Sequence, residues 1–238
     1  MSAPARPRPQ LDPERIIETL RLLRVRIDER FPGSGLAMLA GDLLGVAEDS
    51  VARLQRIVRP NVPIRLGVGV LLAAIVALLA RLVSGVRIHV MVSDFGAFLQ
   101  LLDTAKNVVL FLGAAVFFLL TLESRMRRAR ALRSVRELRA AAHLVDMHQL
   151  TKDPDRIAER GLATASSPEL AMTAYELSRY LDYCSELLSL TSKIAALYAQ
   201  NFDDPVVLNA VDEVEALTTG LSSKVWQKIV VLNHADLM

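Results

Sequence analysis

The chain of 238 residues lacks several features that would identify a class of protein. It contains one cysteine, Cys184, and no Asn-x-Ser/Thr acceptor for N-glycosylation. A single thiol excludes an intrachain disulfide framework and a zinc site built from cysteines, which is typical of a reducing compartment. The formal net charge is only +2, so the sequence does not favour a nucleic acid as the main partner.

Aromatic residues are also scarce, at 5%, although 52% of the residues are hydrophobic and 23% are charged. The mean hydropathy of +0.32 is too high for an ordinary soluble domain. Apolar and charged residues must therefore be segregated along the chain. Residues 1–11 are rich in proline and arginine with no apolar run behind them, which predicts a disordered tail and no cleavable signal peptide.

Two apolar runs predict transmembrane helices at about 66–86 and 102–122. The first has no charge between Arg65 and Arg81, and it spans roughly 30 Å if Arg81 reaches the headgroups. The second lies between Lys106 and Glu123. Both runs are apolar all round and one short loop apart, so we predict a two-helix transmembrane hairpin over 63–122 rather than buried helices of a soluble bundle. Within the loop, alternating residues over 86–92 predict a short extended stretch.

Arginines gather before the first run and after the second, whereas the connecting segment has few. The positive-inside rule therefore predicts that both termini lie in the cytoplasm. We expect a multi-pass protein of the cell membrane, a bacterial inner membrane. Four arginines that follow the second run are expected to contact lipid headgroups, with RNA or DNA as the alternative ligand. They are Arg125, Arg127, Arg128 and Arg130.

Asp103 and Lys106 lie three residues apart at the start of the second predicted span. On a helix this spacing allows an ion pair. The pair is expected either at the outer membrane surface or inside the membrane, where it would mark an ion path.

A short polar residue stands directly before proline at four points, and each pair predicts the start of a helix. The pairs are Asp12-Pro13, Asp153-Pro154, Ser167-Pro168 and Asp204-Pro205. We predict N-terminal cytoplasmic helices over 12–62, from Pro13 to about Arg30 and from Leu36 to Arg59. The second span should continue to about Leu150, and further helices should cover 154–160, Pro168 to about Gln200, and Pro205 to about Asn233.

The fold class predicted is therefore an all-α membrane protein, with a cytoplasmic helical domain over 123–238 packed as a three-helix or four-helix bundle. Two neighbouring apolar stripes on the helix after Pro168 form a face wide enough to contact two partner helices. Cys184 lies in one stripe and is predicted to be a small core residue rather than a nucleophile. The stripes are Leu177, Leu181, Cys184 and Leu188, and Tyr180, Tyr183, Leu187, Leu190, Ile194 and Leu197.

The only candidates for catalysis or metal binding are His143, Asp146 and His148. His148 follows His143 by five residues, some 140° round a helix, so the two imidazoles cannot bind one metal without a break in the helix. The alternative is that these side chains cap and pair at a helix end. Trp226, between Lys224 and Lys228, marks either a binding patch or membrane-surface anchor, or a core or rim aromatic. No cofactor or metal is predicted.

We therefore expect a non-enzymatic integral membrane protein that oligomerises or scaffolds a helical protein partner through its cytoplasmic helices. Small residues in the first span, such as Gly67 and Gly69, would permit close contact between helices. One alternative is an oligomeric pore, membrane effector or transport component that uses Asp103 and Lys106. The other is a membrane-bound metal enzyme or hydrolase.

Overall fold

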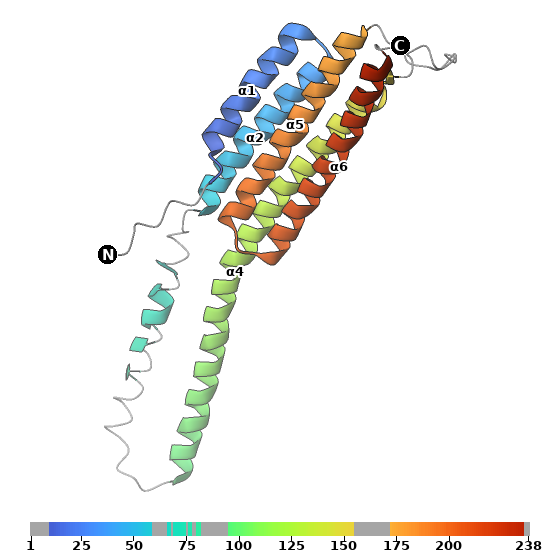
Figure 1. Ribbon diagram of the computed structural model, residues 1–238. Coiled ribbons are helices and arrows are strands. Elements are labelled where there is room, and N and C mark those ends of the chain that lie inside the picture. The colour runs from blue at the N-terminus through green and yellow to red at the C-terminus, as the bar shows by residue number, and fades with distance from the viewer. Residues whose placement is uncertain are drawn as a thin grey trace, which may run out of the picture. The chain divides into compact units, whose positions relative to one another are not determined.

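The computed structural model describes residues 10–58, part of 66–81, 95–154 and 172–235. Its named elements are all α-helices, so the all-α prediction is confirmed for this part of the chain. The predictions for 1–9, 86–92, 155–160 and the helix start at Ser167-Pro168 lie outside the described residues. The elements are α1 (Pro13–Arg30), α2 (Gly35–Val58), α4 (Phe95–Leu150), α5 (Ala174–Asn201) and α6 (Pro205–Ala235) (Figure 1).

The chain divides into two compact units, one within residues 1–58 and 130–238 and the other within 59–129. The first unit is a helical bundle of α1, α2, α5, α6 and the C-terminal part of α4. The N-terminal and C-terminal helices, treated as separate regions from the sequence, thus share one bundle. The described residues of the second unit belong to the start of α4 and to helical positions between 66 and 81.

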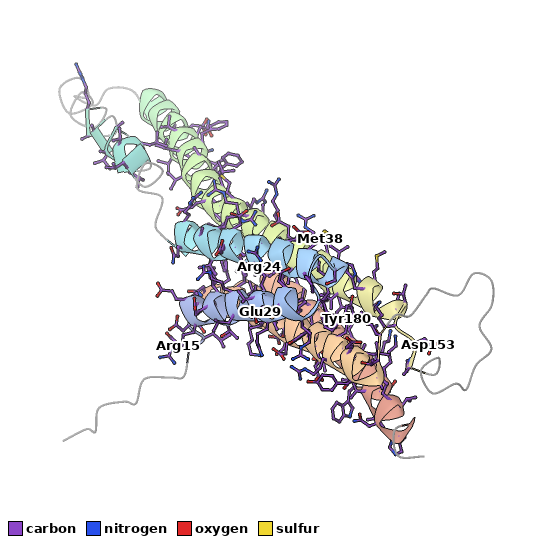
Figure 2. The ribbon with its side chains drawn as sticks, turned by 90° about the horizontal axis from the view of Figure 1, so that it is seen from above. Arg15, Arg24, Glu29, Met38, Asp153 and Tyr180 are labelled. Carbon is purple, nitrogen blue, oxygen red and sulfur yellow. The ribbon has the colours of Figure 1, made fainter. Side chains whose placement is uncertain are left out.

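The cap on α1 follows the sequence prediction. Asp12 Oδ1 accepts hydrogen bonds from the backbone N–H groups of Glu14 at 3.0 Å and Arg15 at 3.5 Å, and Pro13 occupies the first helical position. After α1 the chain turns through Gly33, whose φ of 67° favours glycine. The charged side chains of α1, Arg15 among them, are exposed to solvent (Figure 2).

The core of the bundle draws on all five helices. Buried residues recur at helical spacing on α1, α4 and α6, and both predicted stripes of α5 are buried. Phe31, at the end of α1, meets the ring of Tyr180 edge-on at 5.5 Å between centroids. The Tyr198 hydroxyl donates to the carbonyl oxygen of Ser50 on α2 at 2.9 Å. The helices that cover the α5 stripes therefore belong to the same chain.

The predicted helix over 168–200 is wrong at residues 172–173, the first part of it that the structure describes. Met172 and Thr173 are not helical, and α5 begins at Ala174. Thr173 and Glu176 form a capping box: the Glu176 N–H donates to Thr173 Oγ1 at 3.2 Å, and the Thr173 N–H donates to Glu176 Oε2 at 2.8 Å. This pairing satisfies two N–H groups that a helix end leaves free. The Thr-x-x-Glu spacing in the sequence identifies this start.

Replacing Thr173 with alanine is expected to lower the free energy of unfolding by about 1 kcal/mol, because the cap acceptor is lost. Thr173→Ser retains the hydroxyl and should stay close to wild type. Denaturant unfolding followed by circular dichroism measures the stability of both variants, and an equal loss in the two would contradict the capping role.

The hydrogen bond from the Thr173 N–H lowers the pKa of Glu176. The hydrogen bond from the Thr173 N–H to the Glu176 carboxylate therefore adds to the stability of the folded protein above pH 4.5, the ordinary pKa of this carboxyl. This stabilisation is lost as the pH falls through the lowered pKa of the folded state.

Helix α4 continues without a break from Phe95 to Leu150, so the prediction of one helix from the second apolar run to about Leu150 is confirmed. Its last turns are joined to the bundle by side chains of α2 and α6. Arg53 of α2 forms an ion pair with Glu137. Arg139 Nη1 lies 2.7 Å from Glu213 Oε2 of α6.

The apolar part of α4 differs from the rest of the helix. Within the described residues, one helical stretch, from Lys106 to Leu150, is long and apolar enough to cross a membrane, judged by length and composition. None of its most apolar 18-residue window is buried. The predicted first span at 66–86 is described only in part, as helical positions between 66 and 81. The structure therefore supports a single candidate span and leaves the hairpin as a proposal.

Candidate functional site

The predicted catalytic or metal candidates lie near the C-terminal end of α4. His143 is exposed, and Asp146 accepts a hydrogen bond from the side-chain amide of Gln149. The ring of His148 lies against α2, where a Cβ added to Gly35 would be only 2.5 Å from its Cε1. Across the described ranges, no group of three His, Cys, Asp or Glu side chains is placed to hold a metal ion.

The polar residues at this helix end make structural contacts. Lys228 Nζ of α6 donates to the carbonyl oxygens of Gln149 at 2.6 Å and Lys152 at 3.0 Å. A cation at these carbonyls satisfies acceptors that the end of α4 leaves free and is favoured by the helix dipole. Burial lowers the pKa of Lys228, while Asp153 and Asp146 act in the opposite direction. Lys228 thus fastens α6 to the C-terminal end of α4.

The charged residues along the rest of α4 are placed as follows. Lys106 Nζ lies 2.6 Å from Asp103 Oδ1, and both side chains are mostly exposed. Arg127 pairs with Glu123 at 3.1 Å. Arg125 and Arg130 are exposed, and Arg128 is half-buried.

Cys184 is fully buried in the bundle. Burial raises the pKa of its thiol to about 12, against the smaller opposing effects of Lys228 and Lys152. A thiol that stays protonated is a poor nucleophile. In this structure Cys184 serves as a packing residue.

The buried thiol leads to a labelling prediction. At pH 8, iodoacetamide should modify Cys184 in the folded protein at least about a hundredfold more slowly than in the unfolded chain, since opening the bundle costs several kcal/mol. Because the folded pKa is raised from 9.0 to about 12, the thiol contributes stability below pH 9 that declines as the pH rises towards 12. Mass spectrometry measures the modified fraction; equal rates in buffer and in denaturant would contradict this prediction.

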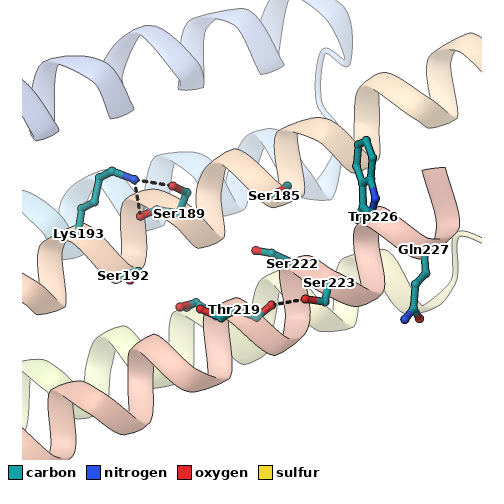
Figure 3. Close-up of a pocket in the computed structure, with 10 residues that line it drawn as sticks. Ser185, Ser189, Ser192, Lys193, Thr219, Ser222, Ser223, Trp226 and Gln227 are labelled. Carbon is teal, nitrogen blue, oxygen red and sulfur yellow. Dashed lines mark hydrogen bonds between the residues drawn. The ribbon is translucent and has the colours of Figure 1, made fainter. Parts of the chain in front are cut away.

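Helices α5 and α6 form an antiparallel hairpin (Figure 1). A groove of about 550 Å³ runs along the two helices (Figure 3). Short hydroxyl side chains line both of its walls and leave the space open. The tryptophan at its edge, Trp226, is 64% exposed. The lining residues are Ser185, Ser189, Ser192 and Lys193 on α5, and Thr218, Thr219, Ser222, Ser223, Trp226 and Gln227 on α6.

The hydrogen bonds within the groove are local. Lys193 Nζ donates to Ser189 Oγ at 2.6 Å, and Ser223 Oγ donates to the carbonyl oxygen of Thr219 at 3.0 Å (Figure 3). A second depression of about 540 Å³ shares Ser185, Ser189, Lys193 and Trp226 with the groove.

Of the groove residues, Trp226 was a candidate from the sequence, whereas the hydroxyl groups were not predicted. Ser185, Ser189 and Ser192 recur at helical spacing, which would have indicated a polar stripe. The facing residues of α6, such as Ser222, lie some thirty positions further along the chain, and only the turn between the helices brings them together.

Comparison of the chain with protein-family models, with curated proteins and with solved structures found no match. The groove presents hydroxyl groups, an ammonium group and an indole ring, which are groups that bind a ligand.

Proposed function

We propose that the protein is a non-enzymatic integral membrane protein that holds a helical bundle at the cytoplasmic face of the membrane. The observation that supports this proposal most strongly is the exposed apolar surface of α4. Phe111 is 78% exposed, and Phe117 and Phe118 are also exposed. Water disfavours such a surface by about 25 cal/mol per Å², whereas the lipid interior accepts a continuous apolar helix.

Membrane attachment is tested by washing isolated membranes with alkaline carbonate, which releases peripheral proteins. The full chain should remain in the pellet. Recovery of the protein in the supernatant would overturn the proposal. The predicted orientation places both termini in the cytoplasm, because arginines follow α4's apolar run at Arg125, Arg127, Arg128 and Arg130, where they would meet anionic headgroups.

We further propose that copies of the chain associate through their membrane segments. The apolar stripes of α5, first interpreted as a partner surface, are covered by helices of the same chain and are not available. A Cβ added to Gly67, Gly69 or Gly113 would meet no atom within 4 Å. Small residues beside open space permit close contact between membrane helices.

The native mass of the protein in mild detergent tests this association. Wild type should form a defined oligomer, and the variant Gly67→Leu/Gly69→Leu should shift towards the monomer. Gly45→Leu serves as the control, because Gly45 is exposed on α2 with no atom within 4 Å of an added Cβ. A strictly monomeric wild type without any co-purifying partner would remove both oligomerisation and scaffolding from consideration.

A second candidate function is an oligomeric pore or transport component. The Asp103–Lys106 ion pair favours it, since the pair stands where the apolar stretch of α4 begins. Charged groups at the end of a membrane helix often act on ions. Ion flux into liposomes that contain the protein, compared between wild type and Asp103→Asn, tests this function. Absent or unchanged flux would exclude it.

A further inference from the structure

We propose that the α5–α6 groove binds a polyhydroxylated ligand that carries one anionic group, such as a sugar or polyol phosphate. The ligand is either a free solute or the headgroup of a lipid. This inference goes beyond membrane attachment and association, and it rests on the chemistry of the groove alone. The groove's volume of about 550 Å³ lies within the range of roughly 300–1,000 Å³ for small-molecule sites.

Several hydroxyl groups of the groove are free to bind a ligand. The side-chain hydroxyls of Ser185, Ser192, Thr219 and Ser222 make no hydrogen bond to any residue that the structure describes, whereas Ser189, Ser223 and Thr218 are bonded locally. Each free hydroxyl can donate one hydrogen bond and accept others. Two come from α5 and two from α6, so a ligand between the walls can bond to both helices.

The charge of the groove favours one anion. Lys193 has no carboxylate within 4.0 Å in the described part of the chain, and its Nζ bonds only to atoms of Ser189. The two acids that line the second depression with Lys193 are each paired: Asp182 with Arg179 at 2.9 Å, and Glu186 with Arg26 at 2.9 Å. The ammonium group of Lys193 therefore offers a charge-assisted bond to a phosphate or carboxylate.

Trp226 supplies a flat surface for the ligand's ring. Its indole extends from α6 towards α5 at the edge of the groove (Figure 3). The exposed ring combines an apolar face with an N–H donor. A sugar or cyclic polyol presents both an apolar ring face and hydroxyl groups, which match these two properties.

A docked helix from a partner protein fits the groove less well. Helix association in water depends on burying apolar area, and the apolar residues that border the second depression are already buried. Leu190 is 6% exposed, Val225 is 0% exposed and Ile229 is 5% exposed. Trp226 alone would contribute substantial new apolar contact, and the free hydroxyls would face an apolar surface.

Trp226 is the only tryptophan in the chain, so its fluorescence reports directly on the groove. The full chain in mild detergent is titrated with glucose 6-phosphate, myo-inositol 1-phosphate and short-chain phosphatidylinositol, and separately with glucose and inorganic phosphate. We expect a saturable change in emission with at least one compound that combines hydroxyls and phosphate. Saturation by phosphatidylinositol alone would assign a lipid headgroup, and saturation by the soluble compounds would assign a free solute.

Two lysine variants distinguish ligand binding in the groove from a nonspecific effect of removing one positive charge. Lys193→Gln should weaken binding by about tenfold or more, the equivalent of one charge-assisted hydrogen bond. Lys224→Gln removes an exposed charge from a residue that does not line the groove, and it should bind as wild type. The proposal is overturned if no anionic polyol changes the emission, or if both variants weaken binding equally. It is also overturned if the emission changes on dilution without ligand, because a second copy would then occupy the groove.

Discussion

Replacing Leu23 of α1 with alanine is expected to destabilise the entire bundle and thereby to expose Cys184 of α5. Leu23 is fully buried, and a buried leucine shortened to alanine typically costs about 2–5 kcal/mol through lost contacts and the cavity that remains. The two residues lie far apart in sequence but share one core. Labelling of Cys184 by iodoacetamide should therefore accelerate by about 30-fold or more, which corresponds to 2 kcal/mol.

The neighbouring residue provides a matched control. Leu22 is 56% exposed, so Leu22→Ala removes the same atoms from the solvent face and should change the labelling rate less than about threefold. Labelling is measured on the full chain by mass spectrometry at low denaturant. If Leu23→Ala left the rate at the wild-type value, the N-terminal helices would not stabilise the core around Cys184.

Helix ends marked by local chemistry were predictable from the sequence. Asp12 and Asp204 each accept hydrogen bonds from the N–H groups that follow them, and α1 and α6 begin where the Asp-Pro pairs predicted. The helix start predicted at Ser167-Pro168 did not take account of the Thr-x-x-Glu spacing, which marks the start of α5 at Thr173. Caps act over three or four residues, so a sequence contains everything needed to identify them.

Contacts between distant segments were not predictable in the same way. The stripes of α5 were identified correctly as buried, but a periodic pattern does not say which helix covers it. The structure places α1 and α2 there, through contacts such as Tyr198 with Ser50. For the same reason the groove could not be predicted, because it needs Ser185 on one helix and Ser222 on another to face a common space.

The apolar run of α4 was identified from composition, since lipid and water select residues by polarity rather than by partner. The substitution Ala115→Arg tests whether this apolar run of α4 spans a membrane, and we expect its effect to be large. Ala115, near the middle of the run, is exposed in the structure. Arginine at the centre of a transmembrane helix costs about 2.5–3.5 kcal/mol for insertion, so Ala115→Arg should prevent α4 from crossing in most molecules.

A reporter at the C-terminus detects the change in topology. In wild type, alkaline phosphatase fused after Met238 should be inactive, because the C-terminus is predicted to be cytoplasmic. In Ala115→Arg the activity should rise at least about tenfold, given the insertion cost, or the protein should leave the membrane fraction. Ala140→Arg is the control, since Ala140 is exposed on the same helix within the bundle and should behave as wild type. If both variants kept the phosphatase inactive and remained membrane-bound, α4 would lie outside the lipid, and its exposed phenylalanines would need a protein partner to cover them.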